Sequence, residues 1–185
     1  TAVAVVTVAD IISSTAIAQN ITVNLDASGN ATIVAADVNN GSSDNCGPVT
    51  LAIDVSTFTC SDIGANNVIL TVTDANSNTS TATAVVTVAD IASPTAITQN
   101  ITVNLDASGN ATIVAADVNN GSSDNCGPVT LAIDVSTFTC SEVGANNVIL
   151  TVTDANSNTS TATAVVTVAD IASPTAITQN ITVNL

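Results

Sequence analysis

The sequence predicts an all-β chain built from tandem immunoglobulin-like β-sandwich domains, and three observations carry this prediction. First, residues 1–80 and 81–160 differ at only six positions, so 74 of 80 match, and residues 161–185 repeat 81–105 unchanged. Second, apolar and polar residues alternate over short runs, as in half-buried strands. Third, segments rich in Gly, Asn, Asp and Ser separate the runs. A period of 80 is too long for a solenoid unit and suits a small domain.

The repeat also predicts the domain boundaries. Ile-Ala-Ser-Pro at 91–94 breaks the strand pattern and is typical of a linker. We therefore expect full domains at 11–90 and 91–170. Residues 1–10 would be the last strand of a preceding repeat, and 171–185 the first strand of the next. The chain reads as a window on a longer array.

Within one period, the first half predicts two strands. Ile101, Val103 and Leu105 alternate with polar residues. A turn follows at 106–110, where glycine supplies the positive φ of a tight turn. A second strand is expected over 111–118, before a loop dense in turn-forming residues.

The second half predicts the remaining strands. Residues 129–135 alternate most regularly, and a short strand at 136–140 carries the only aromatic residue of the period, Phe138. Val148, Leu150 and Val152 share one face of the next strand. A turn at 154–158 leads into a last strand over 159–169. About seven short strands result, with no helical periodicity.

The charge of the chain excludes several functions. It has 15 acidic residues and no Lys, Arg or His, for a net charge of −15. Nucleic acid and anionic membrane surfaces both need cations on the protein. No apolar run has the roughly 18 residues that span a bilayer, so we expect no membrane insertion. The charge indicates either a solvated acidic surface or an affinity for metal cations.

Catalysis is not expected, because general acid–base and nucleophilic catalysis depend largely on His, Lys, Tyr and Cys. The first three are absent. A pair of carboxylates hydrolyses glycosides in other proteins, but this chain lacks the Trp, Tyr and Arg side chains that hold sugars. We predict no enzymatic activity and no catalytic cofactor.

Each full period holds two cysteines: Cys46 and Cys60, then Cys126 and Cys140. Without His or a CxxC motif they do not resemble a zinc site. Pairing within the repeat is the simplest expectation, and a loop of about 15 residues would contribute about 3 kcal/mol. Such a bond indicates an oxidising, extracellular compartment. The alternative is two buried free thiols per period.

Acidic and amide residues form a candidate calcium site in each period. The segment DANSN at 154–158 places oxygen ligands at alternate positions, as calcium loops do, but lacks the rest of that motif. The alternative is a hairpin turn whose Asp and Asn bond their own backbone. Asp170, at a strand end, is a further candidate between domains. The candidate ligands are Asp37, Asp44, Asp74 and Asn76 in one period, and Asp117, Asp124, Asp154 and Asn156 in the next.

Two long segments carry a resemblance to a known family. The run DNCGPVTLAIDVSTFTCSEVGANNVILTVTDANSNTSTATAVVTV at 124–168 resembles the hyalin-repeat domains, above all those in giant surface adhesins of Bacteroidota, and AITQNITVNLDASGNATIVAADVNNGSS at 96–123 is similar to them too. Many relatives carry a further Cys in the last strand, where this chain has Thr161, Ala162 and Thr163. That departure leaves Cys126 with Cys140 as the intra-repeat pair.

The resemblance implies an immunoglobulin-like fold, export to the cell surface by the type IX route, and a place in adhesive filaments, including those of gliding motility. We therefore expect a stalk segment that projects an adhesive tip, with neighbouring repeats of the same chain as its partners. Two alternatives remain open. One is a multivalent binder of surface polysaccharide; the other is a fibre whose acidic faces pair laterally through calcium.

Overall fold

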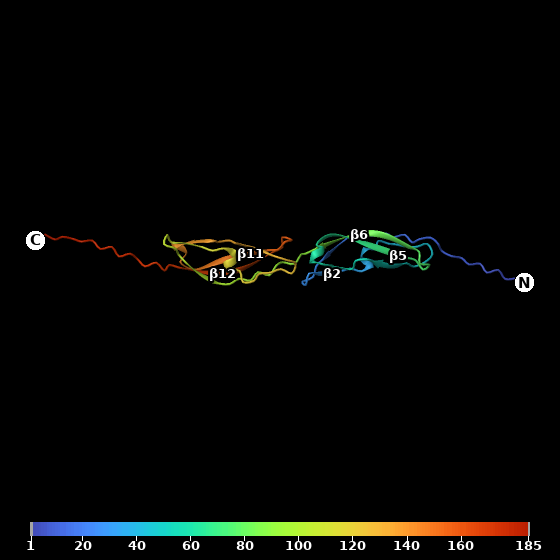
Figure 1. Ribbon diagram of the computed structural model, residues 1–185, viewed down its shortest axis with the longest axis horizontal. Helices are drawn as coiled ribbons and strands as arrows, with labels where there is room; N and C mark the ends of the chain where they lie inside the picture. The colour runs from blue at the N-terminus through green and yellow to red at the C-terminus, as the bar shows by residue number, and fades with distance from the viewer. Residues whose placement is uncertain (1, 185) are drawn as a thin grey trace. The chain divides into compact units, whose positions relative to one another are not determined.

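The computed structural model describes residues 2–184, which fall into two compact units (Figure 1). The first unit runs to Ala92 and also takes in residues 125–127. The second contains residues 93–124 and the chain from Pro128 onward. Among the described residues, no helix has the length and apolar character needed to cross a membrane.

The first unit is a β-sandwich. Strands β1, β6, β5 and β3 form a four-stranded sheet in that order, and β2 pairs with β4 in a second sheet. Every pair is antiparallel except β1 with β6. Its elements are β1 (Ile21–Asn24), β2 (Asn30–Thr32), α1 (Ala35–Val38), β3 (Thr50–Ile53), β4 (Thr57–Thr59), the 3-10 turn η1 (Cys60–Asp62), β5 (Gly64–Thr73) and β6 (Thr79–Ala89).

The second unit repeats this arrangement at an offset of 80 residues. The sheet order is β7-β12-β11-β9, with β8 paired to β10. Its elements are β7 (Ile101–Asn104), β8 (Asn110–Thr112), α2 (Ala115–Val118), β9 (Thr130–Ile133), β10 (Thr137–Thr139), η2 (Cys140–Glu142), β11 (Gly144–Thr153) and β12 (Thr159–Ala169). This architecture confirms the all-β, immunoglobulin-like sandwich that the alternating pattern predicts.

The core of each unit lies between its two sheets. In the second unit Val148, Leu150 and Val152 of β11 are fully buried, as their shared strand face predicts. Phe138 of β10 is 1% exposed and contributes the largest side chain. Burying an aliphatic or aromatic side chain of this kind contributes about 1.5–3 kcal/mol, so this small apolar cluster is the main source of stability in a unit that has no Lys, Arg or His.

The expected strand at 111–118 is only partly correct. Its first residues form β8, but Ala115–Val118 turn into the short helix α2. The carboxylate of Asp117 accepts a hydrogen bond from the Val114 N–H at 2.8 Å, which closes this turn. Val118 is then fully buried in the core. Among the described residues each unit has six strands, close to the expected number of about seven.

The described residues before and after the two sandwiches, 2–10 and 170–184, lie in no helix or strand. Residues 2–10 repeat residues 82–90 with one change, yet they form no strand. The matching strand β6 pairs with β5 along its length, whereas no described strand pairs with residues 2–10. Residues 170–184 are likewise outside any element.

Candidate cation site and the disulfide

Three aspartates of the first unit come together: Asp10 before β1, Asp44 in the loop between α1 and β3, and Asp74 directly after β5. Each offers a carboxylate oxygen, and these oxygens all lie within 4.8 Å of one another. Asp74 is buried, whereas Asp10 and Asp44 are half-buried. A shallow hollow beside them is lined by Ile12, Ser13, Thr15, Ser43, Asp44 and Asn45.

Asp74 closes the turn between β5 and β6. Its Oδ1 accepts hydrogen bonds from the backbone N–H groups of Asn76 and Asn78, and its Oδ2 accepts from the Asn78 side chain at 2.7 Å. Burial raises the pKa of Asp74, but these hydrogen bonds outweigh burial, so the pKa lies below its ordinary value. The DANSN segment is therefore a hairpin turn held by its own Asp and Asn, and the same Asp also faces the other two carboxylates.

Asp10 and Asp44 each keep one oxygen without a hydrogen bond. Oδ1 of Asp10 accepts from the Ile12 N–H, and Oδ2 of Asp44 accepts from the Cys46 N–H. The other oxygen of each carboxylate is buried and has no hydrogen-bond partner among the described residues. Buried carboxylate oxygens in that state are costly unless something compensates their charge.

The chemistry of this donor set fits a hard cation. The chain contains no cationic side chain to neutralise the three carboxylates. Carboxylate and carbonyl oxygens are the ligands that Ca²⁺ takes, usually six to eight of them. The three aspartates supply part of that number of ligands. The side chain of Asn78 also donates to the carbonyl oxygen of Asp10 at 3.2 Å, which connects the β5–β6 turn to the segment that contains Asp10.

Not every predicted ligand lies in this cluster. Asp37 does not, because its carboxylate accepts from the Val34 N–H at 2.7 Å and closes helix α1; Asp117 does the same in α2. Asn76 contributes its backbone N–H to the turn, while its side chain is exposed. Asp37 and Asp117 thus close short helices with one carboxylate oxygen each and lie outside the aspartate clusters found among the described residues.

The predicted ligands of the second period occupy the corresponding local structures. Asp154 closes the β11–β12 turn with bonds from the N–H groups of Asn156 and Asn158, and Asp124 is half-buried in the loop before β9. Sequence reasoning missed Asp10. The signal was available, because Asp10 is the 80-residue counterpart of Asp90 and Asp170, and Asp170 had been singled out at its strand end.

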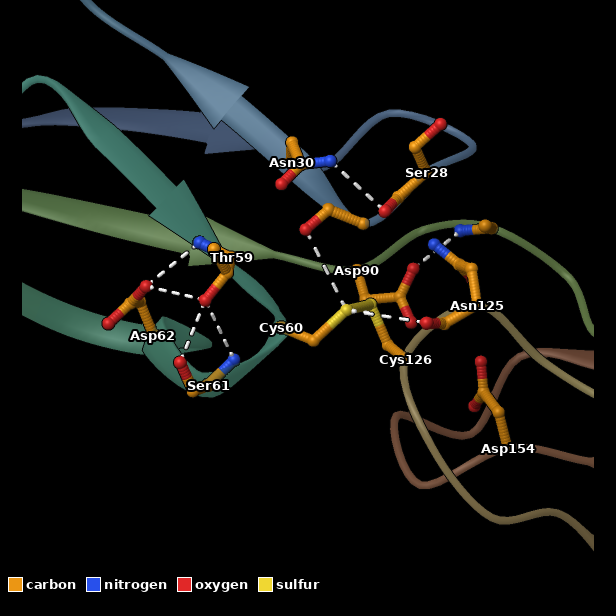
Figure 2. The surroundings of a disulfide bond; sticks show 12 residues. Ser28, Asn30, Thr59, Cys60, Ser61, Asp62, Asp90, Asn125, Cys126 and Asp154 are labelled. Atoms are coloured by element: carbon orange, nitrogen blue, oxygen red, sulfur yellow. Dashed lines mark hydrogen bonds between the residues drawn. A yellow bond between two sulfur atoms is a disulfide. The ribbon is translucent and has the colours of Figure 1, made fainter.

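One disulfide joins Cys60 to Cys126, which are 66 residues apart with their Cα atoms 5.2 Å apart (Figure 2). By sequence Cys126 belongs to the second period, but residues 125–127 are part of the first compact unit. The Asn125 side chain donates to the carbonyl oxygen of Asp26 at 3.3 Å and holds this segment beside the turn before β2. Cys46 and Cys140 are free and exposed.

The predicted pairing within each period is wrong, for a geometric reason. Cys46 follows Asp44, which lies with Asp74 at one end of β5, whereas Cys60 precedes the other end. The ten residues of β5 extend about 30 Å at about 3.3 Å per residue. After Cys46 the chain enters β3, whose Thr50 pairs with Thr73 at the far end of β5, and it then crosses to β4 in the other sheet and reaches Cys60 before β5 begins. A disulfide needs Cα atoms within about 7 Å.

Cys60 sits against the backbone of the turn at 26–29. Its Sγ is 3.7 Å from the carbonyl oxygen of Gly29 and 3.6 Å from that of Asn125. Gly29 has a φ of +75°, and a Cβ added there would lie 2.5 Å from the sulfur. Glycine is therefore required at this position both for its positive φ and for the space that the sulfur occupies.

Comparisons with known proteins identify no family for this chain. No protein-family description matches the chain, and no curated protein does. Among solved structures, human protocadherin-24 EC1-2 is 11% identical with a TM-score of 0.45, covering 86% of this chain and 99% of that one. Protocadherin gamma B7 domains 1–4 are 11% identical (TM-score 0.43), and Sidekick-1 immunoglobulin domains 1–4 are 13% identical (0.26); each match covers 85% of this chain. The chain spans about half the length of these last two.

Proposed function

We propose that this chain is a structural segment of a large, repetitive cell-surface adhesin, in which stacked periods give length and project an adhesive tip. The observation that carries the proposal is the near-identity of two periods that each fold into a compact sandwich. A spacer needs only a stable unit copied many times. The hyalin-repeat resemblance supports surface attachment or gliding motility as the use of such a filament.

An extracellular setting follows from the cross-link in this proposal. Disulfides persist in oxidising compartments such as the cell surface and are rare in the cytosol. The Cys60–Cys126 bond therefore favours a surface or secreted location. The net charge of −15 without any cationic side chain keeps such a chain soluble and discourages collapse onto anionic surfaces.

Stretching of single molecules tests the stalk role directly. A load-bearing segment should unfold in two discrete steps, one per unit. The disulfide withholds from extension the chain between Cys60 and Cys126, a sequence separation of 66, so reduction should add about 230 Å of length at about 3.5 Å per residue. Units that extend without a force peak would contradict a load-bearing role.

A multivalent polysaccharide binder is the alternative function. The chain has only two aromatic residues, Phe58 and Phe138, and both are buried in the cores. Stacking of sugars on exposed aromatic rings is therefore not available to this chain. A spacer predicts no signal on an array of glycans and surface polysaccharides, whereas a binder predicts a signal that strengthens when the chain is presented in many copies.

Calcium has a structural role in the proposal. Asp10, Asp44 and Asp74 would hold one ion with some of its oxygens, and the ion would compensate the two buried carboxylate oxygens that have no hydrogen-bond partner. Bound there, calcium would tie the segment before β1 to the β5–β6 turn. Sequence counterparts of all three, Asp90, Asp124 and Asp154, recur in the next period.

A further inference from the structure

The disulfide and the repeat have different spacings. Cys60 and Cys126 are 66 residues apart, whereas equivalent residues are 80 apart and Cys46 precedes Cys60 by 14. The bond therefore joins the second cysteine of one period to the first cysteine of the next. Extended along the chain, this pattern assigns partners outside residues 1–185 to two cysteines only, Cys46 and Cys140. These are the two free thiols of the structure.

The site that receives the bond is already formed around Cys140. Gly109 has a φ of +78°, close to the +75° of Gly29, and a Cβ added there would lie 2.7 Å from the Cys140 sulfur. The sulfur is 3.8 Å from the Gly109 carbonyl oxygen, against 3.7 Å for the bonded pair. The bond thus needs no local rearrangement at this end, so little conformational entropy is lost in forming it.

Residues around the bonded Cys60 are less exposed to solvent than the equivalent residues around the free Cys140. With residues 125–127 in place, Cys60 and Ile63 are half-buried and Gly29 is buried. At the corresponding positions of the second unit, Cys140 is exposed, Val143 is 51% exposed and Gly109 is only half-buried. Residues 45–47, around the free Cys46, are exposed, whereas Asn125 and Cys126 of the bonded segment are half-buried. Each free cysteine therefore lies on an exposed surface, and the equivalent surface around the bonded pair is partly covered.

We propose that Cys46 and Cys140 are the two open halves of a repeated cross-link between consecutive periods of the same chain. Cys140 bonds to the first cysteine of a following period, and Cys46 to the second cysteine of a preceding one. This inference rests on the proposed function, because it requires further periods. A following period on the same chain is favoured as the partner because its effective concentration is of order millimolar.

The bond forms by oxidation of two thiols. One thiolate attacks an oxidised small-molecule disulfide, such as oxidised glutathione, and forms a mixed disulfide with release of one glutathione thiolate. The second thiolate then attacks the mixed disulfide and displaces the other glutathione. In sum, two protein thiols and one oxidised glutathione yield one protein disulfide and two reduced glutathiones.

A chain lengthened by one period tests the proposal. A copy of residues 26–90 added after Leu185 completes a third period, since residues 171–185 already supply its start. Both chains are refolded at high dilution with oxidised and reduced glutathione, alkylated, and cut by a protease that cleaves before Asp. Cys140 is then released on peptide 134–153, which differs in sequence from the peptide that carries Cys60 or its added copy.

The proposal predicts that peptide 134–153 carries a free thiol in the 185-residue chain and is bonded to a DNCGPVTLAI peptide in the lengthened monomer. Replacing the added DNC cysteine by Ser should free it again, with the circular dichroism spectrum unchanged. A thiol that remains at Cys140 in the folded, lengthened chain, or a bond found only between separate chains, would overturn the proposal. Neither result affects the stretching test, so failure of the cross-link and failure of the stalk role are distinguishable.

Discussion

Cys60 and Cys140 hold the same position in two periods that match at 74 of 80 residues, but they differ in state. Cys60 is bonded and half-buried, whereas Cys140 is an exposed thiol. The surrounding turn and the distance to the glycine carbonyl oxygen are nearly the same in both. The bonded cysteine is the one that meets a DNC segment of the next period, which supplies Cys126.

A second contrast lies at one of the six substitutions. Ser14 is 4% exposed, and its hydroxyl donates to the Val72 carbonyl oxygen and lies 3.1 Å from the hydroxyl of Ser80. The second unit has Pro94 at this position, which carries no donor. There the Ser160 hydroxyl is buried without a hydrogen-bond partner among the described residues. One substitution thus removes two hydrogen bonds from an otherwise repeated core.

The largest expected effect comes from removing the cross-link. Cys126→Ser should destabilise the first unit by about 4 kcal/mol, the chain-entropy value for a closed loop of 66 residues. Denaturant unfolding followed by circular dichroism measures this change. Cys46→Ser removes an exposed thiol and should change stability by less than about 0.5 kcal/mol. Equal effects of the two variants would refute the pairing.

Calcium should distinguish the aspartate cluster from the rest of the acidic surface. At a calcium concentration 100 times its Kd, binding adds about 2.7 kcal/mol to the free energy of unfolding. Asp44→Asn should abolish most of that gain. Asp170→Asn removes the same charge from an exposed residue outside the cluster and should leave it intact. If a chelator leaves the thermal midpoint of the native chain unchanged, the cluster is not a cation site.

Exchanging the residue at position 14 or 94 should bring the two units closer in stability. Ser14→Ala is expected to cost the first unit about 1 kcal/mol, because it removes a buried hydrogen bond and leaves the Ser80 hydroxyl without one partner. Pro94→Ser supplies the missing hydroxyl near Ser160, partly offset by the greater freedom of the unfolded chain without proline. Urea midpoints of the two variants, read against the native chain, measure both effects; a neutral Ser14→Ala would contradict this view.

The smallest effect concerns Glu142, where the first period has Asp62. Hydrogen bonds from the side chains of Thr139 and Ser141 and from the Thr139 N–H hold the pKa of Glu142 below its ordinary value of 4.5. Because the folded pKa is lowered, this stabilisation is present above about pH 4.5 and is lost as the pH falls through the folded pKa. Thermal unfolding of Glu142→Gln between pH 5 and pH 3, in steps of about 0.5, should fall less steeply with acid than that of the native chain. If the thermal midpoints of the variant and the native chain fall equally with acid, Glu142 does not stabilise the fold in this way.

The strands and turns could be predicted because local pattern determines them. The alternation of Val148, Leu150 and Val152 places them on one strand face, and all three are fully buried. The DANSN turn follows from the ability of Asp to bond the backbone two and four residues on. Residues 115–118 were not predictable as a helix, because a single helical turn is too short to show a period and forms only through the Asp117 cap and the burial of Val118.

The cysteine pairing and the cation cluster could not be derived in the same way, because both depend on non-local geometry. A spacing of 14 between Cys46 and Cys60 suggests proximity only if the chain turns back between them, but β3 and β4, which lie between them, belong to different sheets. Asp10 joins Asp44 and Asp74 from a segment outside any element. No spacing within a single period points to it.

Disulfide mapping of the Cys46→Ser variant tests the central claim, a bond between consecutive periods, most directly. In the native chain the peptides 44–53 and 124–133 are identical, and this substitution makes them distinguishable after cleavage before Asp. We predict that peptide 54–61 is bonded to peptide 124–133 while peptide 134–153 carries a free thiol. A bond between peptides 124–133 and 134–153, with peptide 54–61 free, would show pairing within the period and contradict the account.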